Sequence, residues 1–181
     1  QAMTALSLVY PVQNMINAVA IGFGIGINAR VSYHLGAGNT KMADAAATHG
    51  FFLSAVHGIL MTVISIAVMP VFLQMYTQDE TAIRMGLEYS TVVFLFSTVI
   101  SISLFFEKLF QAVGKMKVSM IALLVGCISN IILDPLLIWG IGFFPKLGIR
   151  GAALATGIGQ VLTIAVYMVF YILKPIPVRV T

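Results

Sequence analysis

The sequence alternates between long apolar runs and short polar interruptions. A helix that crosses the hydrocarbon core of a bilayer needs about 20 mostly apolar residues, and several runs reach this length. They predict spans at residues 5–33, 50–75, 89–113, 117–141 and 151–173. The pattern therefore predicts an all-α integral membrane protein with five transmembrane helices over residues 1–173. The stiff, basic, proline-containing residues 174–181 are expected to start a linker.

Composition and charge agree with a membrane protein. Hydrophobic residues make up 60% of the 181 residues and charged residues only 9%, whereas soluble domains carry about 25% charged residues. The net charge of +4 comes from basic residues scattered between the spans, so we expect no nucleic-acid partner. Most basic residues follow the first, third and fifth spans: Arg30, Lys41, Lys108, Lys115, Lys117, Lys174 and Arg179. The positive-inside rule places these residues in the cytoplasm of a multi-pass protein of the cell membrane.

This orientation puts the first residue, Gln1, outside the cell. No signal peptide with a charged start and a cleavage site opens the chain. We therefore interpret the chain as a fragment that lacks an earlier helix.

The strongest candidate for function is Asp134, which lies inside the fourth predicted span. A charged side chain at the centre of a membrane helix costs about 2.5–3.5 kcal/mol on insertion scales, so it normally faces a cavity or a partner. Asn130 lies one helical turn earlier, where its amide can donate to the carboxylate or share a cation with it. Pro135 is expected to kink the helix and free the carbonyl group of Ile131. In the alternative reading, Asp134 marks the water boundary and Pro135 begins a loop.

Other polar side chains within the spans are candidates for lining a cavity. In the first span, Gln13, Asn14 and Asn17 form a polar patch that serves either a cavity or hydrogen bonding between helices. His57 relays protons or packs as a neutral side chain, and we favour packing. Glu107 lines a cavity mouth or pairs with Lys108, and we favour the pair. Gln160 adds a polar group to the fifth span.

Several kinds of chemistry have no motif in this sequence. It contains no HExxH, GxSxG or Walker-type phosphate-binding motif, and no paired acidic constellation. Cys127 is the single cysteine, which excludes an internal disulfide and a cysteine-rich metal site. We therefore expect no enzymatic activity, no bound metal and no cofactor other than a coupling ion.

Three stretches resemble the multidrug and toxic compound extrusion (MATE) transporter family. They are Gly22–Gly26 leading into VSYHLGAGN at 31–39, NIILDPLLI at 130–138 and GIRGAALAT at 148–156. The resemblance implies a twelve-helix fold of two six-helix lobes, of which this chain is similar to helices two to six of the N-terminal lobe. The family's first helix and its C-terminal lobe would be missing partners from the same polypeptide.

The resemblance also implies a function, the export of drugs and organic cations in exchange for H⁺ or Na⁺. It places Asp134 and Asn130 at the cation-coupling site, with Thr156 nearby. Protonation of Asp134 would then change the preferred helix geometry and lower the affinity for a cationic substrate. Two alternatives stay open: a flippase for a lipid-linked or polysaccharide substrate, and a membrane scaffold that transports nothing.

Overall fold

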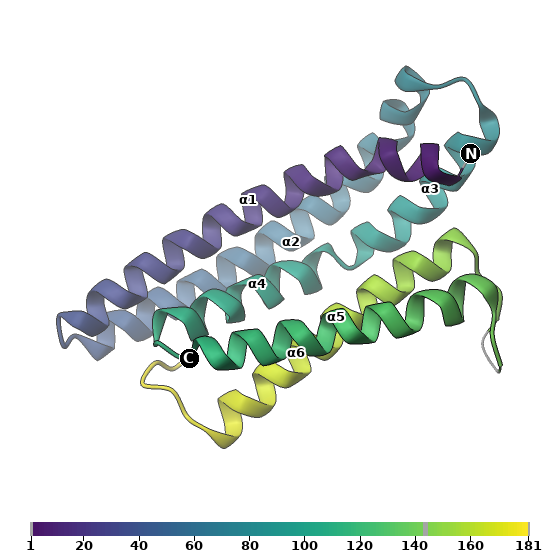
Figure 1. The fold of residues 1–181 in the computed structure, drawn as a ribbon. Helices are drawn as coiled ribbons and strands as arrows, with labels where there is room; N and C mark the ends of the chain where they lie inside the picture. Colours follow the sequence, from purple (N-terminus) through teal and green to yellow (C-terminus); the bar gives the residue numbers. More distant parts are fainter. Residues whose placement is uncertain (1, 143–144, 181) are drawn as a thin grey trace.

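A computed structural model describes residues 2–142 and 145–180, and within these residues the chain is helical (Figure 1). The helices are α1 (Ala2–Gly36), α2 (Thr40–Tyr76), α3 (Glu80–Leu95), α4 (Ser97–Ala112), α5 (Met116–Trp139) and α6 (Ile149–Leu173). Gln1 and Thr181, at the ends of the predicted segments 1–173 and 174–181, lie outside the described residues.

The predicted membrane fold is confirmed, with one important change. Within the described residues, α1, α2, α5 and α6 are each long and apolar enough to cross a membrane. The predicted third span, 89–113, is not one helix, because α3 and α4 meet at Phe96 with a bend of 44°. The helix begins at Glu80, so residues 80–88, ahead of the predicted start of the third span at residue 89, are already part of α3.

The bend at Phe96 lies where two other helices contact the chain. Sharp bends form where a side chain enters the backbone hydrogen-bond ladder. Here the hydroxyl of Thr62 on α2 donates to the carbonyl oxygen of Phe94 at 2.8 Å. The ring of Phe96 meanwhile packs directly on Gly157 of α6. Neither contact is visible from the sequence near Phe96, which contains no proline or glycine.

The helix that contains the second predicted span begins at Thr40, before the predicted start of the span at residue 50. Gly38 adopts a positive φ of 71° after the end of α1, a conformation that glycine adopts without strain. The side chain of Asn39 then accepts a hydrogen bond from the N–H of Met42 and caps α2. The polar residues at 40–48 are therefore the first turns of a long helix.

The helices form two neighbouring groups. α1 packs on α2, and α5 packs on α6, while α3 and α4 contact both groups. The α1–α2 turn, the α4–α5 turn and the C-terminus lie at one end of the molecule, and the α2–α3 and α5–α6 connections lie at the other (Figure 1). This arrangement matches the predicted pattern of membrane crossings.

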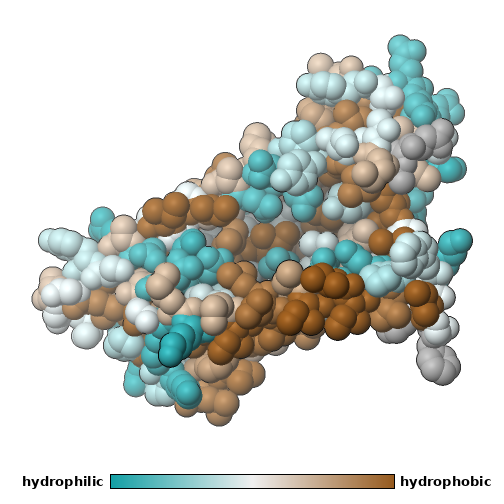
Figure 2. Space-filling view, viewed as in Figure 1, coloured by the Kyte–Doolittle hydropathy of each residue, from teal (hydrophilic) through white to brown (hydrophobic). Residues whose placement is uncertain are grey.

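The interior contains two hydrophobic clusters, one toward each end. The cluster near the C-terminus includes Phe105, Phe110 and Tyr167, and the other includes Met69 and Phe94. The outer face of α5 remains apolar and exposed, as expected for contact with lipid. This face is part of the hydrophobic band along the lower edge of the molecule in Figure 2. The same view shows a hollow between this edge and the part of the molecule that carries the start of α1.

Residues 174–180 run back along the helix ends near the C-terminus. Ile176 and Val178 are buried in the hydrophobic cluster there. The N–H of Arg179 donates to Asp44 of α2 at 2.7 Å, and the N–H of Val180 donates to the hydroxyl of Tyr171. The segment predicted to start a linker is therefore anchored to the helices over these residues.

Glycines bring the backbones of α5 and α6 into close contact. A Cβ atom on Gly151 would lie 2.5 Å from the carbonyl oxygen of Leu137, and one on Gly159 would lie 2.9 Å from the carbonyl oxygen of Gly126. Small residues at such positions allow the dense packing that holds helices together in a membrane. The α5–α6 pair thus depends on having no side chain at these positions.

We predict that Gly151→Ala destabilises the protein by about 1–3 kcal/mol, the usual cost of overpacking, because its Cβ meets backbone atoms that cannot rotate away. The measurement is thermal unfolding in detergent. Gly26→Ala is the control, since a Cβ there meets nothing within 4 Å. Equal stability of the two variants would show that the α5–α6 contact is looser than described.

Candidate functional site

Asp134 lies in the last third of α5 and keeps a buried oxygen without a partner. Its Oδ1 atom is shielded from solvent and accepts no hydrogen bond within the described residues. α5 continues past Pro135 to Trp139 and ends at Gly140, whose φ is 69°. Pro135 therefore does not begin a loop, and that part of the alternative reading is wrong. An unpaired carboxylate oxygen in these surroundings is costly, and it can be satisfied by a proton or a cation.

Asn130 and Thr156 meet across the α5–α6 contact. The amide nitrogen of Asn130 donates to the hydroxyl of Thr156 at 3.3 Å, and this hydroxyl donates to the carbonyl oxygen of Ala152 at 3.1 Å. The close approach of Gly126 and Gly159 one turn away makes this short link possible. The structure thus joins two of the three predicted coupling residues, but the Asn130 amide bonds to Thr156 and not to Asp134.

Tyr89 of α3 adds a residue that the sequence did not single out. It is 8% exposed, and its hydroxyl is close enough to Asp134 for the two groups to interact electrostatically. Tyr89 and Gln13 also line one pocket of about 320 Å³ at the start of α1. The position of Tyr89 at the predicted start of a span gave no signal of this role, because the pocket forms only when α3 packs beside α1.

The other two amides of the α1 patch differ from Gln13. Asn17 is half-buried, whereas Asn14 is exposed on the surface of the described chain. Gln160 is half-buried on α6, one turn after Thr156. Whether these three side chains line a transport cavity stays a prediction.

His57 lies apart from this site, between α2 and α1. Its ring centroid is 5.3 Å from that of Phe23, and the residue is 7% exposed. Its Nε2 atom is buried and has no hydrogen-bond partner among the described residues. The aromatic contact is compatible with the packing role that we favour for this side chain.

Glu107 belongs to a compact polar cluster on α4. Its Oε1 atom accepts from Lys108 Nζ at 3.0 Å and from Gln111 Nε2 at 2.9 Å. Lys108 also donates to Gln111 Oε1 at 3.2 Å, which closes the triangle. The cluster sits against α1, since Asn28 donates to the carbonyl oxygen of Lys108. This geometry supports the ion-pair interpretation over an open cavity mouth.

The described residues contain no group of three or more His, Cys, Asp and Glu side chains able to hold a metal ion. The candidate site is therefore a small polar group on α5 and α6, built around one carboxylate and extended toward α3 and α1.

Comparison with known proteins identifies the family of this chain. The MatE family model matches residues 1–136. The chain belongs to the MATE family of transporters. A solved structure of a multidrug resistance MATE family transporter in its inward-facing conformation superposes with a TM-score of 0.91 at 28% identity, and the match covers 99% of this chain and 40% of that one. The all-α membrane fold is thus that of MATE transporter structures.

The relatives carry different names. The chain is 29% identical to the FAD transporter of Shewanella oneidensis, over 86% of this chain and 34% of that protein. It is 26% identical to the multidrug export protein MepA of Staphylococcus aureus, over 94% of this chain and 37% of that protein. The chain therefore spans about a third of the length of the curated relatives that it matches.

We predict that Thr156→Val weakens the α5–α6 pair, because it keeps the side-chain shape but removes the acceptor of the Asn130 amide. The loss of one such bond costs about 1 kcal/mol, which lowers the melting temperature by about 2–4 °C in a protein of this size. Thr156→Ser keeps the hydroxyl and serves as the control in thermal unfolding. Equal melting temperatures of the Thr156→Val and Thr156→Ser proteins would show that the hydrogen bond between Asn130 and Thr156 does not stabilise the helix pair.

Proposed function

We propose that this chain forms part of the N-terminal lobe of an antiporter that exports organic cations and drugs in exchange for H⁺ or Na⁺. The observation that carries the proposal is the Asp134 carboxylate, which has a buried, unpaired oxygen in an apolar helix. Membership of a family of transporters supports it. The proposal assigns no bond-breaking chemistry to the chain and no cofactor beyond the coupling ion.

A coupling ion has a clear physical role at Asp134. A proton would remove the charge and with it most of the cost of burying the carboxylate. Na⁺ would instead keep the carboxylate charged and needs further oxygen ligands, which the Asn130 carbonyl and the Thr156 hydroxyl offer nearby. Both ions would give the unpaired Asp134 oxygen a partner, so the site is suited to exchange one bound cation for another.

Binding of the ion is proposed to compete with the substrate through charge. An ionised Asp134 attracts an organic cation, whereas a neutralised Asp134 does not. Pro135 follows directly and leaves the Ile131 carbonyl without its usual helical donor, which makes this part of α5 easier to bend. Neutralisation next to this weak point is expected to favour a second helix geometry that releases the substrate.

An anionic cargo is the second candidate function. It is favoured by one observation, the similarity to a protein named FAD transporter. FAD carries a negatively charged pyrophosphate, so an ionised Asp134 would repel it and a neutralised one would not. The two cargoes therefore require opposite states of the same carboxylate during binding.

The first prediction for function is that Asp134→Asn abolishes export. The amide keeps the shape but cannot exchange a proton or neutralise a bound Na⁺. Export of a cationic dye is measured in cells without their own pumps that produce the complete polypeptide carrying this chain, with and without Na⁺ and at two pH values. The ion that stimulates wild-type export identifies the coupling ion.

Glu80→Gln is the matched control, because it removes an exposed carboxylate from the first turn of α3. Normal dye export by the Asp134→Asn protein would contradict the proposal. Export of FAD and not of the dye by the unmodified protein would favour the anionic cargo. Loss of stability in Asp134→Asn, with no export of either compound by the unmodified protein, would indicate a scaffold.

A further inference from the structure

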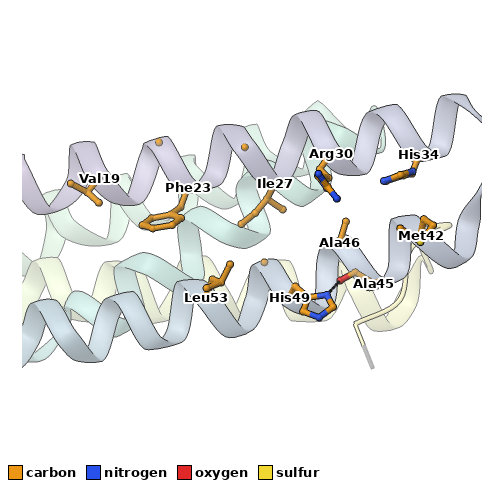
Figure 3. A pocket seen from close by; sticks show the side chains of 13 residues that line it. Val19, Phe23, Ile27, Arg30, His34, Met42, Ala45, Ala46, His49 and Leu53 are labelled. Carbon is orange, nitrogen blue, oxygen red and sulfur yellow. Dashed lines mark hydrogen bonds between the residues drawn. The ribbon is translucent and has the colours of Figure 1, made fainter.

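A long groove runs between α1 and α2, apart from the site around Asp134. Its volume is about 760 Å³, and its lining comes entirely from these two helices. One part is apolar, with Val19, Phe23 and Leu53 on its walls. Figure 3 shows these side chains along the same stretch of the two helices. A cavity with such walls suits a hydrocarbon chain.

The other part of the groove carries basic and imidazole side chains. Arg30 and His34 come from α1 and lie one helical turn apart, and His49 comes from α2. Figure 3 shows Arg30 extending from α1 toward α2, with His34 beside it. No acidic residue is among those that line the groove. This part therefore favours an anionic group over a cationic one.

The guanidinium group of Arg30 has no partner within the described part of the chain. It forms no ion pair or hydrogen bond with residues 2–142 or 145–180. The acidic residue of α2 closest in sequence to the groove, Asp44, accepts instead from the N–H of Arg179. Arg30 also borders a second pocket together with Tyr33 and His34, so its guanidinium group is accessible from two sides.

We propose that this groove binds an anionic phospholipid, with an acyl chain along Val19, Phe23 and Leu53 and the phosphate at Arg30, His34 and His49. Arg30 lies near the end of a membrane-spanning helix, close to the three-residue turn into α2. Phospholipid headgroups surround the ends of such helices, and basic pockets between membrane helices are suited to them. The planar guanidinium group can bind a phosphate through two hydrogen bonds.

Charge also separates this groove from the proposed transport site. An organic cation that is attracted by Asp134 is repelled by Arg30. The groove is therefore assigned to the surrounding lipid and not to the exported compound. This comparison of charges rests on the proposed export of cations, whereas the lining of the groove involves only α1 and α2.

The test measures lipid retention by native mass spectrometry. The complete polypeptide that carries this chain is delipidated in detergent and mixed with phosphatidylglycerol or phosphatidylcholine of the same acyl chains. We expect phosphatidylglycerol to be retained in preference, and Arg30→Gln to reduce its retention about fivefold, the usual effect of one basic side chain near an anionic headgroup. Arg30→Lys is expected to restore most of the retention.

Two further variants separate the headgroup from the acyl chain. Lys117→Gln removes an exposed positive charge at the start of α5, outside the groove, and is expected to leave retention unchanged. Gly22→Leu fills the apolar part, where a Cβ on Gly22 meets nothing within 4 Å, and is expected to reduce retention without removing a charge.

Four results would overturn the proposal. Equal retention of the two lipids, or an unchanged Arg30→Gln protein, would show that no anionic headgroup is recognised. Retention of neither lipid would show that another part of the polypeptide or a second copy covers the groove. Tighter binding of a cationic dye by Arg30→Gln, with lipid retention unaffected, would assign the groove to the transported compound.

Discussion

The close backbone contact between α5 and α6 is the constraint on which the candidate site depends. In a membrane, lipid is as apolar as the helix surfaces, so helices associate through dense packing and not through the exclusion of water. Gly151 approaches the carbonyl group of Leu137, and Gly159 approaches that of Gly126. This distance allows the Asn130 amide to reach the Thr156 hydroxyl. The hydrogen bond between Asn130 and Thr156 therefore forms because α5 and α6 have glycines where they touch.

α6 connects this pair to the rest of the molecule through contacts of the same kind. Gly157 receives the ring of Phe96 at the point where α3 and α4 meet. Next to the bend, the Thr62 hydroxyl donates to the carbonyl oxygen of Phe94. The bend sets the direction of α3, and α3 carries Tyr89 toward Asp134. The bend at Phe96 thus positions Tyr89, although the sequence around Tyr89 does not indicate a role at the site.

The molecule separates its charges by depth and by helix. Asp134 is an acid within the apolar α5 and has a buried oxygen without a hydrogen-bond partner among the described residues. Glu107, by contrast, is neutralised within its own helix by Lys108. Arg30 stands at the mouth of an apolar groove with no acid on its lining. One protein thus contains an unpaired acid, an internally balanced ion pair and a basic side chain beside an apolar groove.

The sequence by itself determined the membrane class and the identity of the candidate acid, and it predicted five crossings. These follow from the length of the apolar runs and from the cost of one carboxylate within them, both of which are local properties. The sequence did not show the bend at Phe96, because its causes, Thr62 and Gly157, lie on other helices. It also left open the partner of the Asn130 amide, since Asp134 one turn along and Thr156 on the next helix are both suitable acceptors. Only the tertiary structure decided between them, because helix packing sets which of two possible hydrogen bonds is short enough to form.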